Sequence, residues 1–338
     1  MLLARYPRVR FAHLPTPIEA MPKLSHHLGG PTLWVKRDDC TGLGGGGNKI
    51  RKLEFLLGEA LVRGASAVLT CGAIQSNHAR QTAAAAAKVG LECHLFLEDR
   101  GIRTTPDYLD GGNVLLNRLF GAEQHVFPRG TDLAVKMQQH ADTLQEQGRN
   151  PYVIPLGGTN PVGDLGYVDC VIEMTQQLNQ MSIVIDHIIV GTGSAGTHAG
   201  LLSGLHALNS SMRVMGIAVS PKPDHRKLVH GVASETIGHL GIAAPLPEDR
   251  VTIAIEYIGS GYGDATEGVI EAIELAAKLE GLLLDPVYTG KALAGLIGLI
   301  RKGHFKRGEN ILFMHTGGLP GLFAYRDDFK GASSSSRP

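Results

Sequence analysis

Short apolar runs alternate along the chain with longer segments in which apolar residues recur at helical spacing. Short apolar runs between turn residues are typical of buried strands, and a 3.6-residue period is typical of helices. The pattern predicts strands at 33–36, 67–71, 92–97, 124–127, 152–155, 187–190, 213–219 and 311–314. It predicts helices over 50–61, 76–89, 113–120, 133–147, 161–180, 197–208, 267–279 and 291–300. This alternation predicts an α/β fold with parallel sheets and helices on both faces.

Composition narrows the classes of protein and partner. The chain has 338 residues, enough for about two domains. Its 32 basic and 32 acidic residues balance, whereas nucleic-acid-binding proteins usually carry a basic excess, so no nucleic-acid partner is expected. No apolar stretch reaches the ~18 residues of a membrane span, so no membrane association is expected. The N-terminus lacks a signal-peptide pattern and the four cysteines lack zinc spacing. We therefore expect a cytoplasmic protein with reduced thiols and no metal ligands.

Ligands of parallel α/β sheets bind beyond the carboxyl ends of the strands, so the loops after strands are the candidate sites. The first loop runs from Gly42 to Lys49 and contains four consecutive glycines, Gly44–Gly47, which would let the backbone approach a ligand closely. Lys49 begins the following helix, where the helix dipole disfavours an ammonium and a lowered pKa is expected. A neutral amine suits Schiff-base chemistry. The alternative for this loop alone is a flexible turn with a solvated lysine.

Two further loops offer anion-binding groups at helix starts. In Gly72–His78, Ser76 is placed to cap a helix, and the next two N–H groups would face an anion; ordinary capping is the alternative. Gly191–Thr197 matches the GxGxxG pattern of dinucleotide sites. The next strand, however, ends at Ser220 without the carboxylate that would bind a ribose. The sequence therefore favours a single phosphate at this loop over a dinucleotide.

A fourth region combines Asp285–Lys291 with His315–Gly318, and both segments follow apolar strand-like runs. They offer the hydroxyls of Tyr288, Thr289 and Thr316. The glycine-rich segment 259–263 adds a second tyrosine, Tyr262, for which simple packing is the alternative.

Five segments in this order resemble the ACC deaminase / D-cysteine desulfhydrase family of pyridoxal-phosphate enzymes: Gly46–Lys49, Gln75–His78, Gly193–Thr197, Asp285–Tyr288 and His315–Gly318. Each motif alone is weak, whereas the ordered set is specific and extends over nearly the whole chain. The resemblance implies the two-domain architecture called fold type II. It implies a large cofactor-binding domain of residues 1–47 plus 162–330 and a small domain of residues 48–161. The serine-rich composition of residues 331–338 predicts a disordered tail.

The resemblance also implies roles for individual residues. Lys49 matches the lysine that binds pyridoxal 5′-phosphate covalently, and Asn77 matches the asparagine beside the cofactor's O3′. The phosphate would be bound by Gly193, Ser194, Ala195, Gly196 and Thr197, with help from Lys52. Thr316 lies where the family contacts the pyridine nitrogen, and Thr289 follows the tyrosine of the Asp-Pro-Val-Tyr motif. Ser76, Tyr288 and Tyr262 match catalytic positions.

Within the family, Thr289 and Thr316 distinguish this chain from ACC deaminases, which carry Glu and Leu at these positions. A hydroxyl near the pyridine nitrogen makes a weaker electron sink than a carboxylate, which suffices when a good leaving group departs from Cβ. The resemblance therefore implies β-elimination from D-cysteine, with L-cysteate sulfo-lyase as the alternative and ACC deaminase as a less favoured one. No cluster of extra basic residues accompanies the motifs, which favours D-cysteine over a sulfonate. The family also implies a homodimer that acts on a small amino acid.

Overall fold

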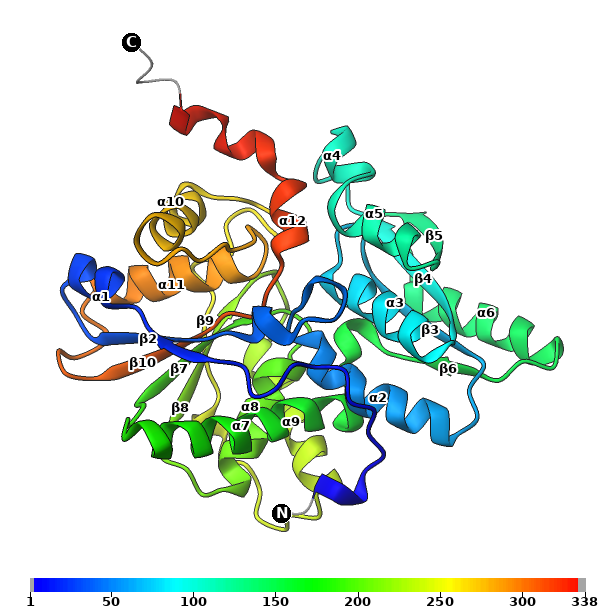
Figure 1. Ribbon diagram of the computed structural model, residues 1–338, viewed down its shortest axis with the longest axis horizontal. Helices are drawn as coiled ribbons and strands as arrows, with labels where there is room; N and C mark the ends of the chain where they lie inside the picture. The colour runs from blue at the N-terminus through cyan, green and yellow to red at the C-terminus, as the bar shows by residue number, and fades with distance from the viewer. Residues whose placement is uncertain (1–2, 334–338) are drawn as a thin grey trace.

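Two sheets organise the chain in the computed structural model, which describes residues 3–333 (Figure 1). The larger sheet has the strand order β1-β2-β10-β7-β8-β9, and the smaller has the order β5-β4-β3-β6. The strands of the larger sheet are β1 (Ile18–Ala20), β2 (Thr32–Lys36), β7 (His187–Thr192), β8 (Arg213–Ala218), β9 (Thr252–Ala254) and β10 (Asn310–Met314). Those of the smaller sheet are β3 (Ala67–Ala73), β4 (Glu92–Asp99), β5 (Glu123–Pro128) and β6 (Pro151–Val153).

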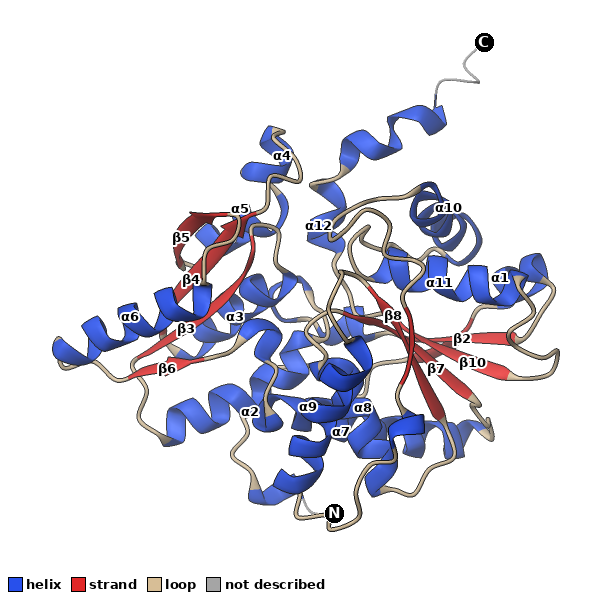
Figure 2. Cartoon of the chain, turned by 180° about the vertical axis from the view of Figure 1, so that it is seen from behind, coloured by secondary structure: helices blue, strands red, loops and turns tan. Residues whose placement is uncertain are grey.

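The expected α/β fold with parallel sheets is confirmed, with one exception at an edge. Strand β1 pairs antiparallel with β2, whereas the other strand pairs in the described residues are parallel. Figures 1 and 2 show the two sheets in separate halves of the molecule. The halves meet where helix α2 (Lys49–Val62) packs on helix α7 (Pro161–Met181). A Cβ at Gly166 would lie 2.4 Å from the carbonyl oxygen of Arg51, so this contact requires glycine.

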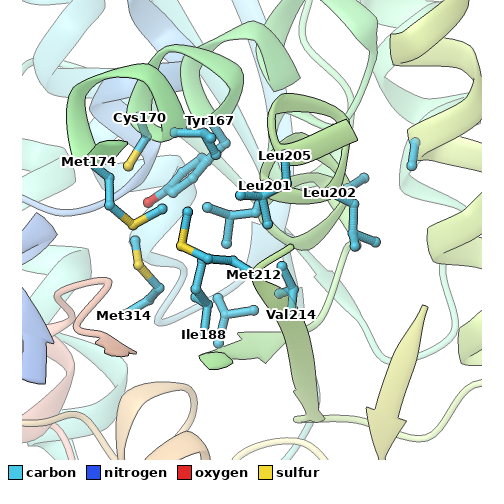
Figure 3. Packing of buried hydrophobic residues seen from close by; sticks show 14 of the residues in the cluster. Tyr167, Cys170, Met174, Ile188, Leu201, Leu202, Leu205, Met212, Val214 and Met314 are labelled. Carbon is cyan, nitrogen blue, oxygen red and sulfur yellow. The ribbon is translucent and has the colours of Figure 1, made fainter. Parts of the chain in front are cut away.

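Both faces of the larger sheet are covered by helices, because successive apolar side chains of its strands point to opposite sides. Ile188 and Val190 of β7 join one core with helices α7, α8 (Gly196–Ala207) and α9 (His225–His239). Figure 3 shows this core, in which Met174 and Leu201 approach the sheet. Ile189 faces the other core, formed with α1 (Pro22–Leu28), α10 (Glu267–Leu275) and α11 (Thr289–Arg301).

The smaller sheet is covered in the same way. Helices α2 and α3 (Asn77–Val89) pack on one face against Val68 and Leu95. Helix α6 (Leu133–Glu146) packs on the other against Leu69 and Phe96. The short helices α4 (Pro106–Leu109), α5 (Gly112–Leu119) and α12 (Leu319–Phe323) complete the described helices, apart from several 3₁₀ turns and a π-helical turn.

Most predicted elements are present within a few residues of their expected ends. Strands β1 and β9 were not predicted, because three residues at a sheet edge carry little pattern. Helix α9 was also missed, although Asp224 caps it by accepting a hydrogen bond from the Lys227 N–H. The helix predicted at 267–279 is α-helical only to Leu275 and continues as a π-helical turn, Ala276–Glu280.

The C-terminal segment continues the fold further than the sequence predicted. The predicted tail at 331–338 begins inside the 3₁₀ segment Arg326–Ser333, and residues 334–338 lie outside the described residues. The four cysteines are free thiols, as expected, and only Cys40 is exposed. Among residues 3–333, no helix has the length and apolar character needed to span a membrane.

Candidate active site

A pocket lies between the two halves at the carboxyl ends of strands from both sheets, where the strand pattern predicted it. It brings together ten of the predicted site residues: Lys49, Ser76, Asn77, Gly193, Ser194, Ala195, Thr197, Tyr262, Tyr288 and Thr316. Three predicted residues do not line it: Lys52, Gly196 and Thr289. Among the described residues, the lining includes the basic side chains Lys49, Arg100 and Lys222 and no carboxylate. The pocket therefore suits an anionic ligand.

The glycine-rich loop before Lys49 is required by the protein's own packing. Gly44–Gly47 all have positive φ, a conformation that favours glycine. A Cβ at Gly46 would lie 2.0 Å from the Asp39 carbonyl oxygen, and one at Gly47 would lie 2.7 Å from the Gln81 side chain. Neither glycine lines the pocket. We therefore replace the interpretation that these glycines admit a ligand. They let the loop fold tightly against its neighbours, and this places Lys49 at the first turn of α2.

The Lys49 amine is held at the pocket wall in a form suited to nucleophilic chemistry. Its Nζ donates a hydrogen bond to the Gly157 carbonyl oxygen at 3.2 Å. Burial and, to a lesser extent, the nearby Lys52 ammonium lower the pKa of Lys49 to about 7, although Asp164 opposes this shift. The expected lowering is thus confirmed, but its main cause is burial, whereas the sequence suggested the helix dipole. Near neutral pH a large fraction of this amine is unprotonated.

The loop between β7 and α8 has the features of a phosphate site. It leads into the N-terminus of α8, whose first N–H groups have no intrahelical acceptor. Ala195 adopts φ +75°, which is strained for a residue with a side chain. The Thr197 hydroxyl accepts a hydrogen bond from the Asn48 amide at 2.9 Å, which leaves its own proton free to donate. The Ser194 hydroxyl accepts one from Thr159 at 2.8 Å.

Lys52 lies directly behind this loop. Its Nζ is 3.0 Å from the Asp164 carboxylate, and both side chains are fully buried. A Cβ at Gly196 would be 2.1 Å from Lys52 Nζ and 2.5 Å from Asp164 Oδ1, so the helix start lies directly on this ion pair. Burial, opposed in part by the Lys52 ammonium, raises the pKa of Asp164 to about 6. Lys52 therefore packs behind the start of α8 and supports the anion site from outside the pocket.

Ser76 and Asn77 form the start of α3, as predicted. Ser76 caps the helix, and its hydroxyl accepts a hydrogen bond from the Ala79 N–H at 3.1 Å. The Asn77 side-chain oxygen accepts a hydrogen bond from the Asn113 side-chain amide at 3.0 Å. The NH₂ group of the Asn77 side chain therefore points away from Asn113. Arg80 in turn donates to the Asn113 side-chain oxygen at 3.1 Å. Asn113 therefore orients Asn77, a role that sequence reasoning missed.

The two predicted tyrosines meet at the pocket. Their hydroxyl oxygens are 3.0 Å apart, and burial raises the pKa of each, so both phenols stay protonated near neutral pH. Lys291 holds the loop of Tyr262 by donating to the Gly261 carbonyl oxygen at 2.6 Å. Asp285 holds Tyr288 by accepting its N–H at 2.9 Å.

The two threonines differ in position. Thr316 lines the pocket. Thr289 is buried outside the lining, where its hydroxyl donates to the Asp285 carboxylate at 2.7 Å and accepts the Asp285 N–H at 2.8 Å. Nothing in this arrangement brings Thr289 to a ligand. It stabilises the turn that carries Tyr288.

Two basic lining residues, Arg100 and Lys222, were not assigned a role from the sequence. Arg100 follows β4, its guanidinium lies 4.5 Å from the centre of the Tyr262 ring, and its Nε donates to Glu98 at 2.6 Å. Lys222 follows β8 and is exposed. The expectation that no cluster of extra basic residues accompanies the motifs did not cover these two residues, which lie outside the motifs. Because both residues follow strand ends, the rule that ligands bind beyond the carboxyl ends of parallel strands could have identified them.

His78 also lines the pocket without a role assigned from the sequence. The Thr70 hydroxyl donates its proton to the Ile154 carbonyl oxygen at 2.9 Å. In its 2.8 Å contact with His78 Nε2, the hydroxyl oxygen is therefore the acceptor and the imidazole N–H is the donor. That tautomer leaves His78 Nδ1 as a buried acceptor without a hydrogen bond among the described residues. Burial, with the nearby lysines, holds the pKa of His78 well below its usual value, so the ring is neutral.

The donor set fits a ligand that carries both a phosphate and an aldehyde. The start of α8 offers N–H groups and the Thr197 hydroxyl to a phosphate. The Lys49 amine, unprotonated in large part near neutral pH, offers a nucleophile to an aldehyde. A Cβ at Gly157 would lie 2.2 Å from the Ser194 hydroxyl and 3.4 Å from Lys49 Nζ, so the backbone here also leaves room between the two groups.

Comparisons with known proteins agree with a site for a ligand of this kind. The chain is 45% identical over 324 residues to a Klebsiella pneumoniae protein described as D-cysteine desulfhydrase, covering 96% of this chain and 97% of that protein. It is 44% identical over the same length to a Salmonella typhimurium protein of the same description. A crystal structure described as an ACC deaminase homologue has a TM-score of 0.87 and 42% identity, covering 97% of each chain.

A more distant structure shares the fold. A crystal structure described as a threonine deaminase has a TM-score of 0.61 at 20% identity, covering 90% of this chain and 92% of that one. The family described as "Pyridoxal-phosphate dependent enzyme" matches residues 9–317, most of the chain. The chain therefore belongs to the pyridoxal-phosphate dependent enzyme family.

Proposed function

We propose that this enzyme is a carbon–sulfur lyase that converts D-cysteine and water to pyruvate, ammonia and hydrogen sulfide. The observation that carries the proposal is the near-full-length similarity, at 44–45% identity, to proteins described as D-cysteine desulfhydrases. The pocket supports it, because the described lining has the Thr316 hydroxyl and no carboxylate. A strong electron sink at the pyridine nitrogen is not needed when sulfide leaves from Cβ.

The proposed ligand contacts follow from the donors on the pocket wall. Lys49 would bind the cofactor aldehyde, the 193–197 loop its phosphate, Asn77 its O3′ and Thr316 its ring nitrogen. When bound, pyridoxal phosphate withdraws electrons from the substrate Cα and so acidifies its proton. The Ser76 hydroxyl and the first N–H groups of α3 would bind the substrate carboxylate, since the helix N-terminus favours an anion.

The protonation states assign the roles of proton acceptor and proton donor to two kinds of group. Lys49, with a pKa of about 7, is the better acceptor for the Cα proton. Tyr262 and Tyr288 are protonated, and one of them donates to the other, so the pair retains one O–H for the leaving sulfur. The Cβ–S bond breaks with its electron pair on sulfur, which takes up that proton. The organic product, 2-aminoacrylate, hydrolyses in water to pyruvate and ammonia.

A second candidate, L-cysteate sulfo-lyase activity, is favoured by one observation. A sulfonate needs a cation near Cβ, and Arg100 and Lys222 both line the pocket. Arg100 is, however, paired with Glu98 at 2.6 Å, and Lys222 is exposed, so neither provides an unpaired buried charge. ACC deamination is less favoured, because opening a cyclopropane demands a stronger electron sink than Thr316 supplies.

The proposal extends to domain division, assembly and location. The two sheets support a division into a large domain of residues 1–47 plus 162–330 and a small domain of residues 48–161. A homodimer is supported by the family resemblance, and a cytoplasmic location is supported by the four free thiols. Sedimentation of the purified enzyme tests the dimer, and fractionation of the source cells tests the location.

The reaction is tested with the holoenzyme and D-cysteine by measuring pyruvate, ammonia and sulfide in the same samples. Equal amounts of the three products support the proposal, and the Lys49→Ala variant should form none of them above background. Consumption of D-cysteine without sulfide release would contradict it.

A further inference from the structure

Three histidines converge on the face of the smaller sheet that α6 covers. His94 lies on β4, His125 on the neighbouring strand β5, and His140 on α6. The ring centres are 4.7 Å apart for His94 and His140, 5.0 Å for His125 and His140, and 6.0 Å for His94 and His125. The cluster lies near the amino-terminal ends of the strands, opposite the ends that form the active-site pocket. The sequence did not predict it, because its members are far apart along the chain.

Four of the six ring nitrogens in this cluster lack hydrogen-bond partners among the described residues. Both ring nitrogens of His94, Nε2 of His125 and Nε2 of His140 are buried and make no hydrogen bond among residues 3–333. Buried polar atoms are normally paired, so four such atoms at one place call for a ligand.

A carboxylate completes the group at its solvent edge. Glu123 is the register partner of His94 in the sheet. Its oxygens lie 3.2 Å from His94 Nδ1 and 3.3 Å from His125 Nε2. The other charges facing the cluster are Glu92, 3.7 Å from His94 Nε2, and Arg149, which pairs with Glu92. Glu123 is exposed, so an ion can enter from solvent on this side.

The spacing is close to that of a metal site. One ligand atom from each histidine can be chosen so that all three lie within 4.8 Å of one another. Nitrogens bound tetrahedrally to zinc at 2.0–2.1 Å are roughly 3.4 Å apart, so the widest pair must close by about 1.4 Å. His94 is buried, and His125 and His140 are only partly buried. Neutral imidazoles with one carboxylate suit Zn²⁺ and its late-transition-metal neighbours, not Mg²⁺.

We propose that His94, His125 and His140, with Glu123 as fourth ligand, form a Zn²⁺-binding site that joins β4, β5 and α6 away from the active site. Because the ion would bind the folded state and link two strands to a helix, its binding stabilises this half of the molecule. The site takes no part in the lyase reaction.

The test measures Zn²⁺ binding to the untagged holoenzyme in excess Mg²⁺, after borohydride reduction so that the cofactor cannot chelate the ion. One equivalent should bind, and the unfolding temperature should rise. His125→Ala with His140→Ala should weaken binding at least 100-fold and abolish the temperature shift, and Glu123→Gln alone should weaken binding about 10-fold. The matched control is His26→Ala with His27→Ala, an exposed pair on α1. It should bind as the wild type does.

A spectroscopic readout identifies the ligands and protects the test against misfolded variants. Cu²⁺ added to the wild type should show hyperfine couplings from imidazole nitrogens, and each single variant, His125→Ala or His140→Ala, should alter them. Circular dichroism shows whether each variant is folded. Absence of stoichiometric Zn²⁺ binding to the wild type would overturn the proposal. Equal binding by the wild type and the folded double variant would also overturn it, and would place the ion elsewhere.

Discussion

The hydroxyl oxygens of Tyr262 and Tyr288 lie 3.0 Å apart at the wall of the pocket, although the two residues come from different loops. Each loop is fixed from behind by a buried charged side chain, Lys291 for the first and Asp285 for the second. With both phenols protonated, the pair can donate only one proton outward. The pair therefore has a single proton-donating role.

The tyrosine pair should act as a unit. We expect Tyr262→Phe or Tyr288→Phe to lower kcat by about 10²–10⁴-fold, as is usual for loss of a general acid. The double variant should be no worse than the more severe single one. Steady-state kinetics with D-cysteine measure this, and cofactor absorbance checks that the site is intact. Tyr257→Phe is the matched control, because that hydroxyl makes no hydrogen bond among the described residues. Multiplicative losses in the double variant would contradict a shared role.

Lys49 should be the residue that holds the cofactor covalently. Lys49→Ala should lose the visible absorbance of the bound cofactor and nearly all turnover. Mass spectrometry after borohydride reduction should find the adduct on Lys49 in the wild type and on no lysine in the variant. Lys23→Ala, which removes an exposed lysine, is the control. A stoichiometric adduct on another lysine of the wild type would refute the assignment.

The pH dependence of cofactor loading follows from the environment of Lys49. With a pKa of about 7, the amine is protonated below that pH and reactive above it, so the loading rate of the apoenzyme should rise through about pH 7. Lys52→Gln removes a charge that lowers this pKa, so the midpoint should move upward. Lys88→Gln, at an exposed position, should leave it unchanged. Borohydride trapping at a series of pH values measures the midpoint. A downward shift in Lys52→Gln would contradict the electrostatic argument.

Thr197 should contribute to phosphate binding. Its hydroxyl proton is free because the oxygen already accepts from Asn48. Thr197→Val removes one hydrogen bond to a charged group, worth about 1.5–3 kcal/mol, so the cofactor Kd should increase by roughly 10- to 100-fold. Equilibrium dialysis measures it, and Thr175→Val on α7 is the control. An unchanged Kd would mean that the phosphate binds elsewhere.

The sequence predicted local features of the site well, because they depend on residues close together in the chain. Ser76 caps α3, as its position before a helical pattern indicated. Lys49, Thr197 and the other motif residues meet because parallel strands end at one edge.

The features that were missed depend on contacts between distant segments. Lys52 pairs with Asp164 across α2 and α7, and Asn113 reaches Asn77 from another helix. Neither pairing leaves a periodic signal in the sequence. The purpose of the glycine run was also misread, since a positive φ required for close packing and one required for ligand access look alike in sequence.

The most direct test of the proposed reaction is a comparison of kcat/KM for D-cysteine, L-cysteine, L-cysteate and ACC with one holoenzyme preparation, following pyruvate, sulfide and sulfite separately. We predict the highest kcat/KM for D-cysteine, sulfide equal to the pyruvate formed, and little or no turnover of ACC. The highest kcat/KM for L-cysteate with release of sulfite, or efficient ring opening of ACC, would contradict the proposed reaction.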